Sequence, residues 1–481
     1  MKLNILAKTG LIFLMAIWSC KDDEADANTP VINNFIPDRG VPGTAVAIFG
    51  RILGSESNTA ISFNGTPATI SRHSGADIEV IVPAGAESGP LTITVGGKTT
   101  VSEKEFTVVV PVAEDPEFFF GADLSYVNQI LDRGGVYREG GMAKDPYAIF
   151  DDHGTDVVRL RLWHNPLWTK EVYEPDGNRL YNELLDVEKS IQRSKELGMK
   201  VLLDFHYSDI WADPGSQEIP AAWLDVKELS VLRDSVYNYT AKTLQYLDRK
   251  GLMPEFVQIG NEINCGMLYE HDGNPVPGFP ACNVCDGQWS NLAAVLNSGI
   301  KAVRDVSAES SVKSRILLHV ADPANITWWF DNVAAGGVVS DFDIIGISYY
   351  PIWHTGVSVD QLSDQISDFR DAYGKDVMIL ETAYPWTSQG NDNYNNIFGS
   401  QTPVTGYSFS QEGQLDMMHK ITQEVIDGGG IGLVYWEPAW ITSPLRDYWN
   451  TGSAWENCAF FDFDGNVLPA IDYMTQSYQQ Q

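Results

Sequence analysis

Apolar positions after Phe118 gather into short runs that contain few polar residues. Between these runs lie longer stretches in which apolar residues recur at the three- and four-residue spacing of a helix. Strands that are apolar on both faces and alternate with helices are typical of a parallel sheet covered by helices. Eight such runs predict an α/β domain, a (β/α)8 TIM barrel, over residues 117–481. The runs are Phe118–Ser125, Val157–Trp163, Val201–His206, Phe256–Ile263, Arg315–Val320, Phe342–Tyr349, Val377–Thr382 and Ile431–Trp436. The helical stretches include Asn182–Leu197, Leu229–Asp248, Trp289–Val306 and Val359–Tyr373.

Residues 30–111 follow a different pattern, in which short β-rich runs alternate with clusters of Gly, Pro, Asn and Ser. A spacing of about ten residues between such runs predicts a small all-β sandwich of the immunoglobulin-like kind. Val112–Pro116 then marks the boundary between the two domains. The runs are Ala45–Phe49, Ala60–Phe63, Glu79–Val82, Leu91–Val95 and Glu105–Val110.

The N-terminus predicts a targeting segment and not part of a fold. Lys2 and Lys8 precede an apolar run, Thr9–Trp18, that is far shorter than the ~20 residues of a membrane-spanning helix. The segment Ile17–Cys20 resembles a bacterial lipobox, in which Cys20 becomes the lipidated first residue. We therefore expect residues 1–19 to be a lipoprotein signal peptide and residues 20–29 to be a lipid-anchored linker. The alternative is an ordinary cleaved signal followed by a solvated linker.

The acidic residues after Cys20 resemble the surface-export signal of some Gram-negative lipoproteins. This predicts an outer-membrane lipoprotein exposed at the cell surface.

The net charge of the chain limits the kinds of ligand that it is expected to bind. With 32 Lys and Arg against 64 Asp and Glu, the formal charge is −32, so nucleic acid is not expected to bind. The hydrophobic fraction of 44% excludes a disordered chain. A neutral or cationic ligand fits this charge, and we expect the protein to be a monomer.

Four cysteines remain after the predicted signal: Cys265, Cys282, Cys285 and Cys458. In an oxidising compartment cysteines tend to form disulfides, and four of them allow three pairings, which the sequence leaves open. Cys282 and Cys285 have the spacing of half a zinc knuckle, but no second pair with that spacing follows. Disulfides are therefore favoured over zinc.

Two carboxylates close otherwise apolar runs, Glu262 in the fourth and Glu381 in the seventh. A buried carboxylate needs a partner, so one interpretation is a structural ion pair with Arg159 or Arg161. The other is a catalytic pair, because two carboxyl groups can hydrolyse a glycosidic bond, one as acid/base and one as nucleophile. Active sites of (β/α)8 barrels lie at the C-terminal ends of the strands, which favours the catalytic interpretation.

The neighbouring residues fit a sugar ligand. Asn261 precedes Glu262 and can donate a hydrogen bond to a sugar 2-hydroxyl. Alternation along the second run places Arg159, Arg161 and Trp163 on the face inside the barrel. Trp163 and Trp436 are predicted to offer flat apolar faces to pyranose C–H groups, although a lone tryptophan is more often part of a core.

Longer motifs resemble two known families. PVINNFIPDRGVPGTAVAIFG, ISFNGTPATI and IEVIVPAGAESGPLTITVGG resemble the IPT/TIG module, which is usually a spacer or a weak binding domain. From Phe119 to about Asp464 the chain resembles glycoside hydrolase family 53 of clan A. The segments that carry this resemblance are GADLSYV, VVRLRLWHNP, LLDFHYSDIWADPGSQEIPAAW, VQIGNEINCGMLY, ISYYPIW, ILETAYPW and VYWEPAW. Clan members that cut mannan, cellulose or xylan share the two glutamates but are not expected to carry the long third motif.

The resemblance implies a retaining arabinogalactan endo-β-1,4-galactanase. Such an enzyme cuts the β-1,4-galactan side chains of pectin (type I arabinogalactan) into galacto-oligosaccharides by double displacement, and the chemistry needs no cofactor. Glu262 matches the acid/base and Glu381 the nucleophile, whose carboxyl groups should lie about 5–5.5 Å apart. Residues expected around the central subsites are Asp123, Arg161, His206, Asp209, Asn261, Tyr349 and Trp436.

The resemblance also suggests a structural calcium ion, which some bacterial members bind between the loops after the seventh and eighth strands. Calcium takes oxygen ligands from carboxylates, amides and carbonyls. Here the matching stretch is Gly390–Asn396, so Asp392 and Asn396, together with Asp447, are the candidate ligands. The alternative is a solvated turn.

Two other functions remain open. A non-catalytic glycan-binding lipoprotein would use the same anchor and module, but it has no need of both strand-end glutamates. A β-mannanase would keep the barrel and change the sugar.

Overall fold

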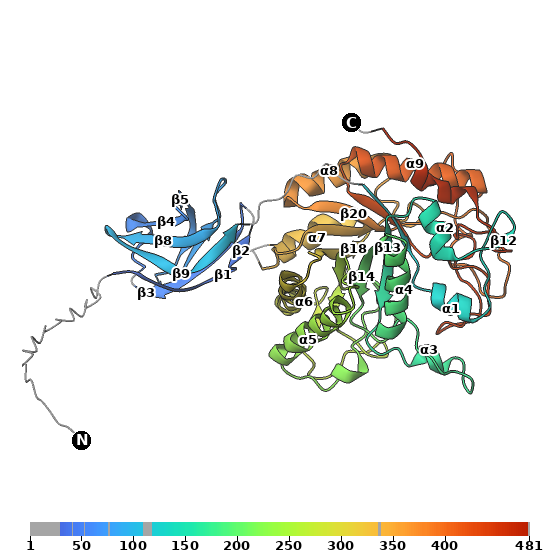
Figure 1. Ribbon diagram of the computed structural model, residues 1–481, viewed down its shortest axis with the longest axis horizontal. Helices are drawn as coiled ribbons and strands as arrows, with labels where there is room; N and C mark the ends of the chain where they lie inside the picture. The colour runs from blue at the N-terminus through green and yellow to red at the C-terminus, as the bar shows by residue number, and fades with distance from the viewer. Residues whose placement is uncertain are drawn as a thin grey trace, which may run out of the picture. The chain divides into compact units, whose positions relative to one another are not determined.

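The computed structural model describes residues 29–40, 42–51, 53–75, 77–108, 118–334 and 338–479. Contacts divide the chain into two compact units, one before and one after residue 112 (Figure 1). The predicted signal peptide, Cys20 with most of the linker, and the boundary segment Val112–Pro116 lie outside the described residues.

The N-terminal unit is a sandwich of two β-sheets, as predicted (Figure 1). One sheet has the strand order β1-β3-β7-β6 and the other β2-β9-β8-β4-β5. Phe35 and Ile48 from the first sheet share one apolar core with Phe63, Ile93 and Phe106 from the second. The strands are β1 (Val31–Ile36), β2 (Arg39–Gly40), β3 (Ala45–Arg51), β4 (Thr59–Phe63), β5 (Thr66–Pro67), β6 (Thr69–His73), β7 (Asp77–Ile81), β8 (Gly89–Val95) and β9 (Lys98–Val108), with a short 3-10 helix at Glu56–Asn58.

The C-terminal unit contains a closed barrel of parallel strands, which confirms the predicted (β/α)8 fold. Each of the eight predicted runs overlaps one barrel strand, and the helices lie outside the barrel (Figure 1). The strands in barrel order are β10 (Phe119–Asp123), β13 (Val157–Leu162), β14 (Lys200–Phe205), β15 (Phe256–Ile259), β18 (Arg315–Ala321), β19 (Ile344–Ser348), β20 (Asp376–Glu381) and β21 (Gly432–Tyr435).

The predicted helical stretches are also present, with ends shifted by a few residues. The helices are α1 (Val127–Asp132), α2 (Pro146–Asp152), α3 (Trp168–Glu171), α4 (Leu184–Glu196), α5 (Leu229–Asp248), α6 (Trp289–Glu309), α7 (Pro323–Ala334), α8 (Leu362–Tyr373) and α9 (Gln411–Asp427), with 3-10 turns at Ala221–Trp223, Val359–Gln361 and Pro469–Thr475. Loops carry two small hairpins, β11 (Arg138–Glu139) with β12 (Met142–Ala143) and β16 (Gly266–Met267) with β17 (Cys282–Asn283). Within the described part of the chain, none of the helices combines the length and the apolar character required to cross a bilayer.

The barrel interior changes from apolar to polar along the strands. Val157, Leu202, Phe256 and Leu317 belong to one apolar cluster inside the barrel. Successive inward residues of a strand are two positions apart, so the next inward layer is polar. Its members on the same four strands are Arg159, Asp204, Gln258 and His319. The polar layer thus lies toward the C-terminal strand ends, where barrel active sites form.

Candidate active site

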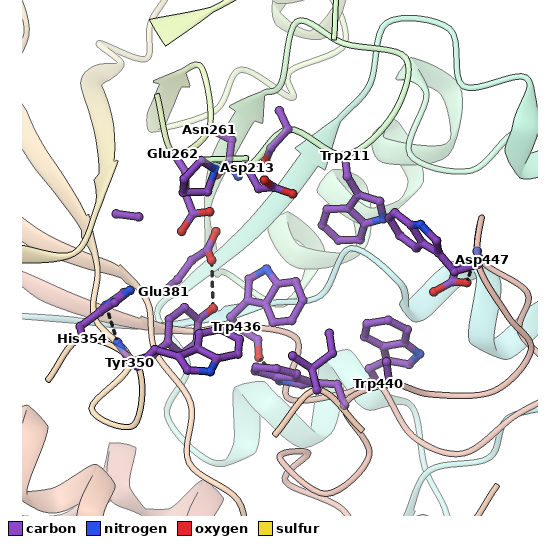
Figure 2. A pocket seen from close by; sticks show the side chains of 18 of the residues that line it. Trp211, Asp213, Asn261, Glu262, Tyr350, His354, Glu381, Trp436, Trp440 and Asp447 are labelled. Carbon is purple, nitrogen blue, oxygen red and sulfur yellow. Dashed lines mark hydrogen bonds between the residues drawn. The ribbon is translucent and has the colours of Figure 1, made fainter. Parts of the chain in front are cut away.

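The two predicted glutamates face one another at the C-terminal ends of their strands (Figure 2). Glu381 is the last residue of β20, and Glu262 lies three residues beyond the end of β15. A carboxylate oxygen of Glu262 and one of Glu381 lie within 4.8 Å of each other. Glu262 has a φ of +45°, a left-handed conformation that few residues other than glycine adopt, so its position is imposed by the surrounding fold.

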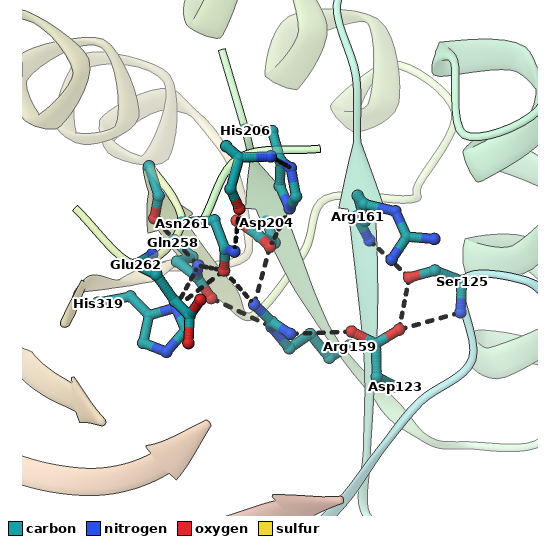
Figure 3. Close-up of polar contacts among 12 residues, drawn as sticks. Asp123, Ser125, Arg159, Arg161, Asp204, His206, Gln258, Asn261, Glu262 and His319 are labelled. Atoms are coloured by element: carbon teal, nitrogen blue, oxygen red, sulfur yellow. Dashed lines mark hydrogen bonds and ion pairs between the residues drawn. The ribbon is translucent and has the colours of Figure 1, made fainter. Parts of the chain in front are cut away.

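A buried arginine organises the polar layer below this pair (Figure 3). Arg159 Nη1 donates to Asp123 and Glu381, each at 2.9 Å, and Nη2 donates to Asp204 at 2.9 Å and Asn261 at 2.7 Å. Burial opposes the charge of Arg159, but the three carboxylates outweigh this effect and raise its pKa above the ordinary value. One guanidinium therefore fixes both an acidic cluster and the amide beside Glu262.

Glu381 is held by two donors. Arg159 binds Oε1, and the hydroxyl of Tyr350 donates to Oε2 at 2.9 Å. Burial raises the pKa of Glu381 to about 7, while Arg159 and Tyr350 favour the ionised form. Because both neighbours donate hydrogen bonds, they stabilise the ionised carboxylate of Glu381, which is the form that a nucleophile needs.

Glu262 has a more strongly raised pKa. Burial and the neighbouring Glu381 carboxylate raise the pKa well above its ordinary value, and the Ser348 hydroxyl, which donates to Oε1 at 2.5 Å, opposes them. Of the pair, Glu262 therefore holds its proton to higher pH. A carboxyl group that stays protonated beside one that ionises is the arrangement of a general acid beside a nucleophile.

A cavity of about 490 Å³ contains both glutamates and is walled mainly by aromatic rings (Figure 2). Trp436 and Trp211 have ring centroids 5.9 Å apart, and both line the cavity. Trp353 and Trp449 are 43% and 61% exposed, so their faces are accessible at the rim. Flat apolar walls around a polar floor suit a sugar chain, whose rings are apolar on their C–H faces and polar at their hydroxyls.

The structure brings some of the predicted residues into the cavity and leaves others outside it. Asn261 and Trp436 line it, together with the two glutamates. Trp163 does not, because its ring is completely buried against Trp168 and Trp211. The prediction that Trp163 offers a face to a sugar is therefore wrong, and its neighbour Trp211 lines the cavity instead.

Three other predicted contacts do not line the cavity but bind residues next to it. Asp123 accepts from Ser125 and Arg159, and Arg161 donates to Glu437 at 3.1 Å while its guanidinium lies 3.9 Å from the ring centroid of Trp211. His206 Nε2 lies 3.1 Å from Asp204, and burial lowers the pKa of this histidine. All three buried side chains thus hold neighbouring residues in place.

The last two predicted substrate contacts, Asp209 and Tyr349, also lie outside the cavity lining and bind backbone groups instead. The carboxylate of Asp209 accepts from the backbone N–H groups of Asn165 and Ala221, so it fixes loops. Tyr349 is completely buried and donates to the carbonyl of Val357. Its neighbour Tyr350 lines the cavity and binds Glu381 instead, which corrects the prediction for Tyr349.

Sequence reasoning missed several residues of the site. Tyr350, Trp353 and Trp440 lie within or next to the quoted motifs, so proximity in sequence was the available signal. Ser348 lies in one of these motifs too, whereas His319 lies within β18 outside all of them and gave no signal; the contacts of both with Glu262 join different strands.

The cysteines form one disulfide, between Cys265 and Cys285. Cys282 and Cys458 are buried thiols, so the expectation of disulfides is right for one pair and wrong for the other two residues. Burial raises the pKa of Cys282 to about 12, and Cys285 is already paired, so a zinc knuckle does not fit here.

The three candidate calcium ligands do not form an open oxygen cage. Asp392 accepts from the backbone N–H groups of Tyr394 and Ser453, and Asp447 accepts from the Tyr394 hydroxyl and two backbone N–H groups. Asn396 donates to the carbonyl of Gln389 at 3.4 Å. Protein N–H and O–H groups therefore bind both carboxylates, while the buried Oδ1 of Asn396 has no hydrogen-bond partner among the described residues. Tyr394 connects the two loops.

Among the described residues, two groups have the spacing of metal ligands. Glu218, His271 and Asp272 lie at the surface, and Glu262, His319 and Glu381 lie in the site. In the second group both ring nitrogens of His319 have hydrogen-bond partners, and Arg159 already neutralises Glu381. This group is therefore organised by hydrogen bonds and an ion pair.

A parallel (β/α)8 barrel with two glutamates facing each other in an aromatic cavity defines a glycoside hydrolase. Comparison with known families specifies which one. Residues 119–474 match the model of Glycosyl hydrolase family 53, and residues 30–108 match that of the IPT/TIG domain. The chain therefore belongs to glycosyl hydrolase family 53.

Individual proteins agree with this assignment. An arabinogalactan endo-β-1,4-galactanase from Cellvibrio japonicus is 43% identical over 370 residues, which cover 76% of this chain and 93% of the relative. An endo-β-1,4-galactanase from Bacillus subtilis is 30% identical over 395 residues, which cover 74% of this chain and 85% of the relative. Among solved structures, the family 53 catalytic domain from Ignisphaera aggregans has a TM-score of 0.65 and 32% identity over 77% of this chain and 99% of its own.

Proposed function

We propose that this protein is a retaining endo-β-1,4-galactanase that hydrolyses β-1,4-galactan. The observation that carries the proposal is the pair Glu262 and Glu381, whose oxygens lie within 4.8 Å of each other and whose neighbours favour different protonation states. Carboxyl groups about 5–5.5 Å apart are typical of retaining glycosidases, because an inverting pair needs room for a water molecule between acid and base. The names of the relatives support galactan as the polymer.

In the first step Glu381 attacks the anomeric carbon and forms a covalent galactosyl-enzyme. Glu262 gives its proton to the glycosidic oxygen, so the leaving chain departs as an alcohol. Arg159 and Tyr350 hold the Glu381 carboxylate in place for the attack. In the second step Glu262, now ionised, takes a proton from water, and the water displaces Glu381 from the sugar.

Asn261 is the proposed partner of the sugar 2-hydroxyl. Its Oδ1 accepts from Arg159, and one Nδ2 hydrogen is donated to the carbonyl of Ala212 at 2.7 Å. The amide is therefore fixed in orientation, and a second Nδ2 hydrogen is left for the ligand in the cavity that Asn261 lines. A hydrogen bond to the 2-hydroxyl strengthens in the transition state and contributes several kcal/mol in such enzymes.

The direct test is product formation from linear β-1,4-galactan, with β-mannan and cellulose alongside, by wild type and Glu381→Ala. Short galacto-oligosaccharides from wild type alone support the substrate and the nucleophile together. Release from mannan instead would favour the β-mannanase alternative. No release by a folded wild type would favour a glycan-binding protein without catalysis.

For localisation, we propose that Cys20 is lipidated and anchors the enzyme to the outer surface of the outer membrane. The lipobox-like segment before Cys20 and the acidic residues after it support this. The protein carrying Cys20→Ala should lose incorporation of labelled palmitate and leave the membrane fraction. Protease treatment of intact cells should remove wild type from the surface, and full protection would contradict surface exposure.

A further inference from the structure

Behind Glu262 lies a buried chain of hydrogen bonds that runs across three neighbouring strands. The Ser348 hydroxyl at the end of β19 is 2.5 Å from Glu262 Oε1. His319 Nε2 on β18 is 2.8 Å from the same hydroxyl, and both Ser348 and His319 are completely buried. His319 and its contacts with Gln258 and Asn261 are drawn in Figure 3.

The direction of these hydrogen bonds depends on which nitrogen of His319 carries the proton. Burial, and then the charge of Arg159, lower the pKa of His319 well below its ordinary value, so the ring is neutral. Its Nδ1 lies 3.3 Å from the backbone N–H of Glu262 and 3.1 Å from Gln258 Nε2. The two hydrogens of Gln258 Nε2 also have the Gly260 carbonyl and Asn261 Oδ1 as acceptors, so the Glu262 amide is the donor that depends on Nδ1. Nδ1 also lies 2.9 Å from Asn261 Oδ1, an acceptor.

Counting donors and acceptors decides between the two tautomers. Asn261 Oδ1 already accepts from Arg159 and Gln258. The backbone N–H of Glu262 has Nδ1 as its acceptor, and the described residues offer it no other. An unsatisfied buried donor costs about 1–3 kcal/mol, so Nδ1 stays unprotonated and the proton is on Nε2.

We propose that His319 and Ser348 are positioning residues that fix which oxygen of Glu262 carries the catalytic proton. His319 Nε2–H donates to Ser348, so the serine proton is directed to Glu262 Oε1. Because Oε1 then acts as an acceptor, the acid proton sits on Oε2, the oxygen left for the glycosidic bond in the cavity. This inference rests on the proposed acid/base role of Glu262.

The charged groups around Glu262 set the sign of the expected pH effect. Glu381 on β20 and Asp213 after β14 raise its pKa, whereas Ser348 on β19 and Arg159 on β13 lower it. His319 on β18 is neutral, and Arg159 and His206 face it. Ser348 donates to the ionised form, so removing the hydroxyl raises the pKa of Glu262. Since Glu262 must be protonated to act as the acid, the basic limb of the kcat/KM profile then moves to higher pH.

The test compares Ser348→Ala, His319→Leu and His319→Gln with wild type in the full-length protein. Two substrates are used: linear galactan, which needs an acid, and a dinitrophenyl galactobioside, whose leaving group does not. Ser348→Ala should move the basic limb up by about one pH unit, the size expected for one hydrogen bond to a charged group. It should lower kcat/KM about tenfold on galactan, a part of the ~10²–10⁴ that acid catalysis supplies, with little loss on the activated substrate.

The histidine variants test the relay itself. His319→Gln keeps an N–H donor and should retain the wild-type pH profile, whereas His319→Leu should behave like Ser348→Ala. Ser194→Ala is the matched control. It removes a buried hydroxyl that donates to the carbonyl of Ser190 within α4, and Ser194 does not line the cavity, so this variant should change neither readout. Nitrogen NMR of the histidines, with His319→Gln to assign the signal, should show Nδ1 unprotonated.

If Ser348→Ala lowered kcat/KM equally on both substrates and left the basic limb in place, Ser348 would have only a structural role and the proposal would be overturned. A protonated Nδ1 in the NMR spectrum would overturn it as well. Glu262→Ala separates this from failure of the proposed function. If that variant spares the activated substrate and Ser348→Ala does not, only the relay is wrong. If Glu262→Ala affects both substrates equally, the acid/base assignment itself is wrong.

Discussion

Glu262 and Glu381 have the same side chain and hold their protons differently because their hydrogen-bond partners differ. Arg159 and Tyr350 both donate to Glu381, whereas Glu262 receives one hydroxyl and faces the Glu381 carboxylate. Two carboxyl groups this close titrate as a pair, and the first proton to leave the pair comes from the better-stabilised carboxylate. The division of roles is therefore a property of the neighbours.

Removing the Tyr350 hydroxyl should weaken the nucleophile. Tyr350→Phe takes away one donor that lowers the pKa of Glu381, so this pKa rises and the carboxylate forms only at higher pH. The acid limb of the kcat/KM profile should move to higher pH, and kcat should fall about tenfold at the low-pH side. The pH–rate profile on galactan measures both.

The adjacent tyrosine provides a matched control. Tyr349→Phe also removes one buried hydroxyl, but that hydroxyl donates to the carbonyl of Val357. It should lower the free energy of unfolding slightly and leave the acid limb in place. If both variants moved the limb equally, Tyr350 would have no specific effect on Glu381.

The raised pKa of Glu262 also predicts a cost to stability. A carboxyl group whose folded-state pKa is raised destabilises the fold as the pH rises above its unfolded value of about 4.3, since the unfolded chain ionises more easily. Glu262→Gln removes this ionisation. Its Tm should equal that of wild type near pH 4 and exceed it increasingly toward pH 8. A Tm difference that does not change with pH would contradict the raised pKa.

At the scale of elements, an irregularity in one strand pair sets the position of Glu381. Met378 and Leu380 point into the apolar interior, so simple alternation would turn Glu381 outward. The register between β19 and β20 shifts after Ile347, and Glu381 comes to lie opposite Ser348. Gly346 leaves the space for Leu380, because a Cβ there would lie 2.2 Å from the leucine side chain. A bulge of this kind re-aims a side chain beside an active site.

The loop after β15 carries Glu262 and is closed by the Cys265–Cys285 disulfide, with a sequence separation of 20. Closing a loop of this length is expected to contribute about 3 kcal/mol to stability. Reduction should lower the unfolding midpoint in denaturant by the corresponding amount, and the double variant Cys265→Ser/Cys285→Ser should have the low midpoint with or without reductant. If reductant lowered the midpoint of the double variant as much as that of wild type, the disulfide would not be the cause of the change in midpoint.

The loops after β20 and β21 should not need a metal. Hydrogen bonds through Asp392, Tyr394 and Asp447 connect them. Adding EDTA or calcium should therefore leave Tm and activity unchanged. A fall of several degrees with EDTA that calcium reverses would restore the calcium hypothesis. Tyr394→Phe removes the hydroxyl that binds Asp447 and should lower Tm by itself.

At the scale of the whole molecule, the two units have separate cores. The sandwich core contains residues of the N-terminal unit alone, and every described residue that lines the cavity belongs to the barrel. Catalysis on a soluble substrate should therefore not depend on the sandwich. Deleting residues 30–111 should leave kcat/KM on soluble galactan within about twofold of wild type, with circular dichroism to establish folding. A larger loss in a folded variant would show that the sandwich helps to form the cleft.

Much of the fold followed from local pattern. Eight apolar runs separated by helical periodicity led to the barrel, because a strand buried on both faces shows in the sequence as an apolar run. The glutamates stood out for the related reason that a charge rarely ends such a run. The substrate contacts were harder to predict. Trp163 and Trp211 are both tryptophans near strand ends, and only packing decides that Trp211 lines the cavity while Trp163 lies behind it.

The sequence by itself determined the barrel, the sandwich, the family and the two strand-end glutamates, since each depends on periodicity or on a motif within one segment. The tertiary structure decided what depends on several strands at once. The bulge that turns Glu381 inward, the choice of Tyr350 over Tyr349, and the chain from His319 through Ser348 to Glu262 come from residues far apart in sequence. Hydrogen bonds and burial act over a few ångströms in space, so these features exist only once the barrel closes.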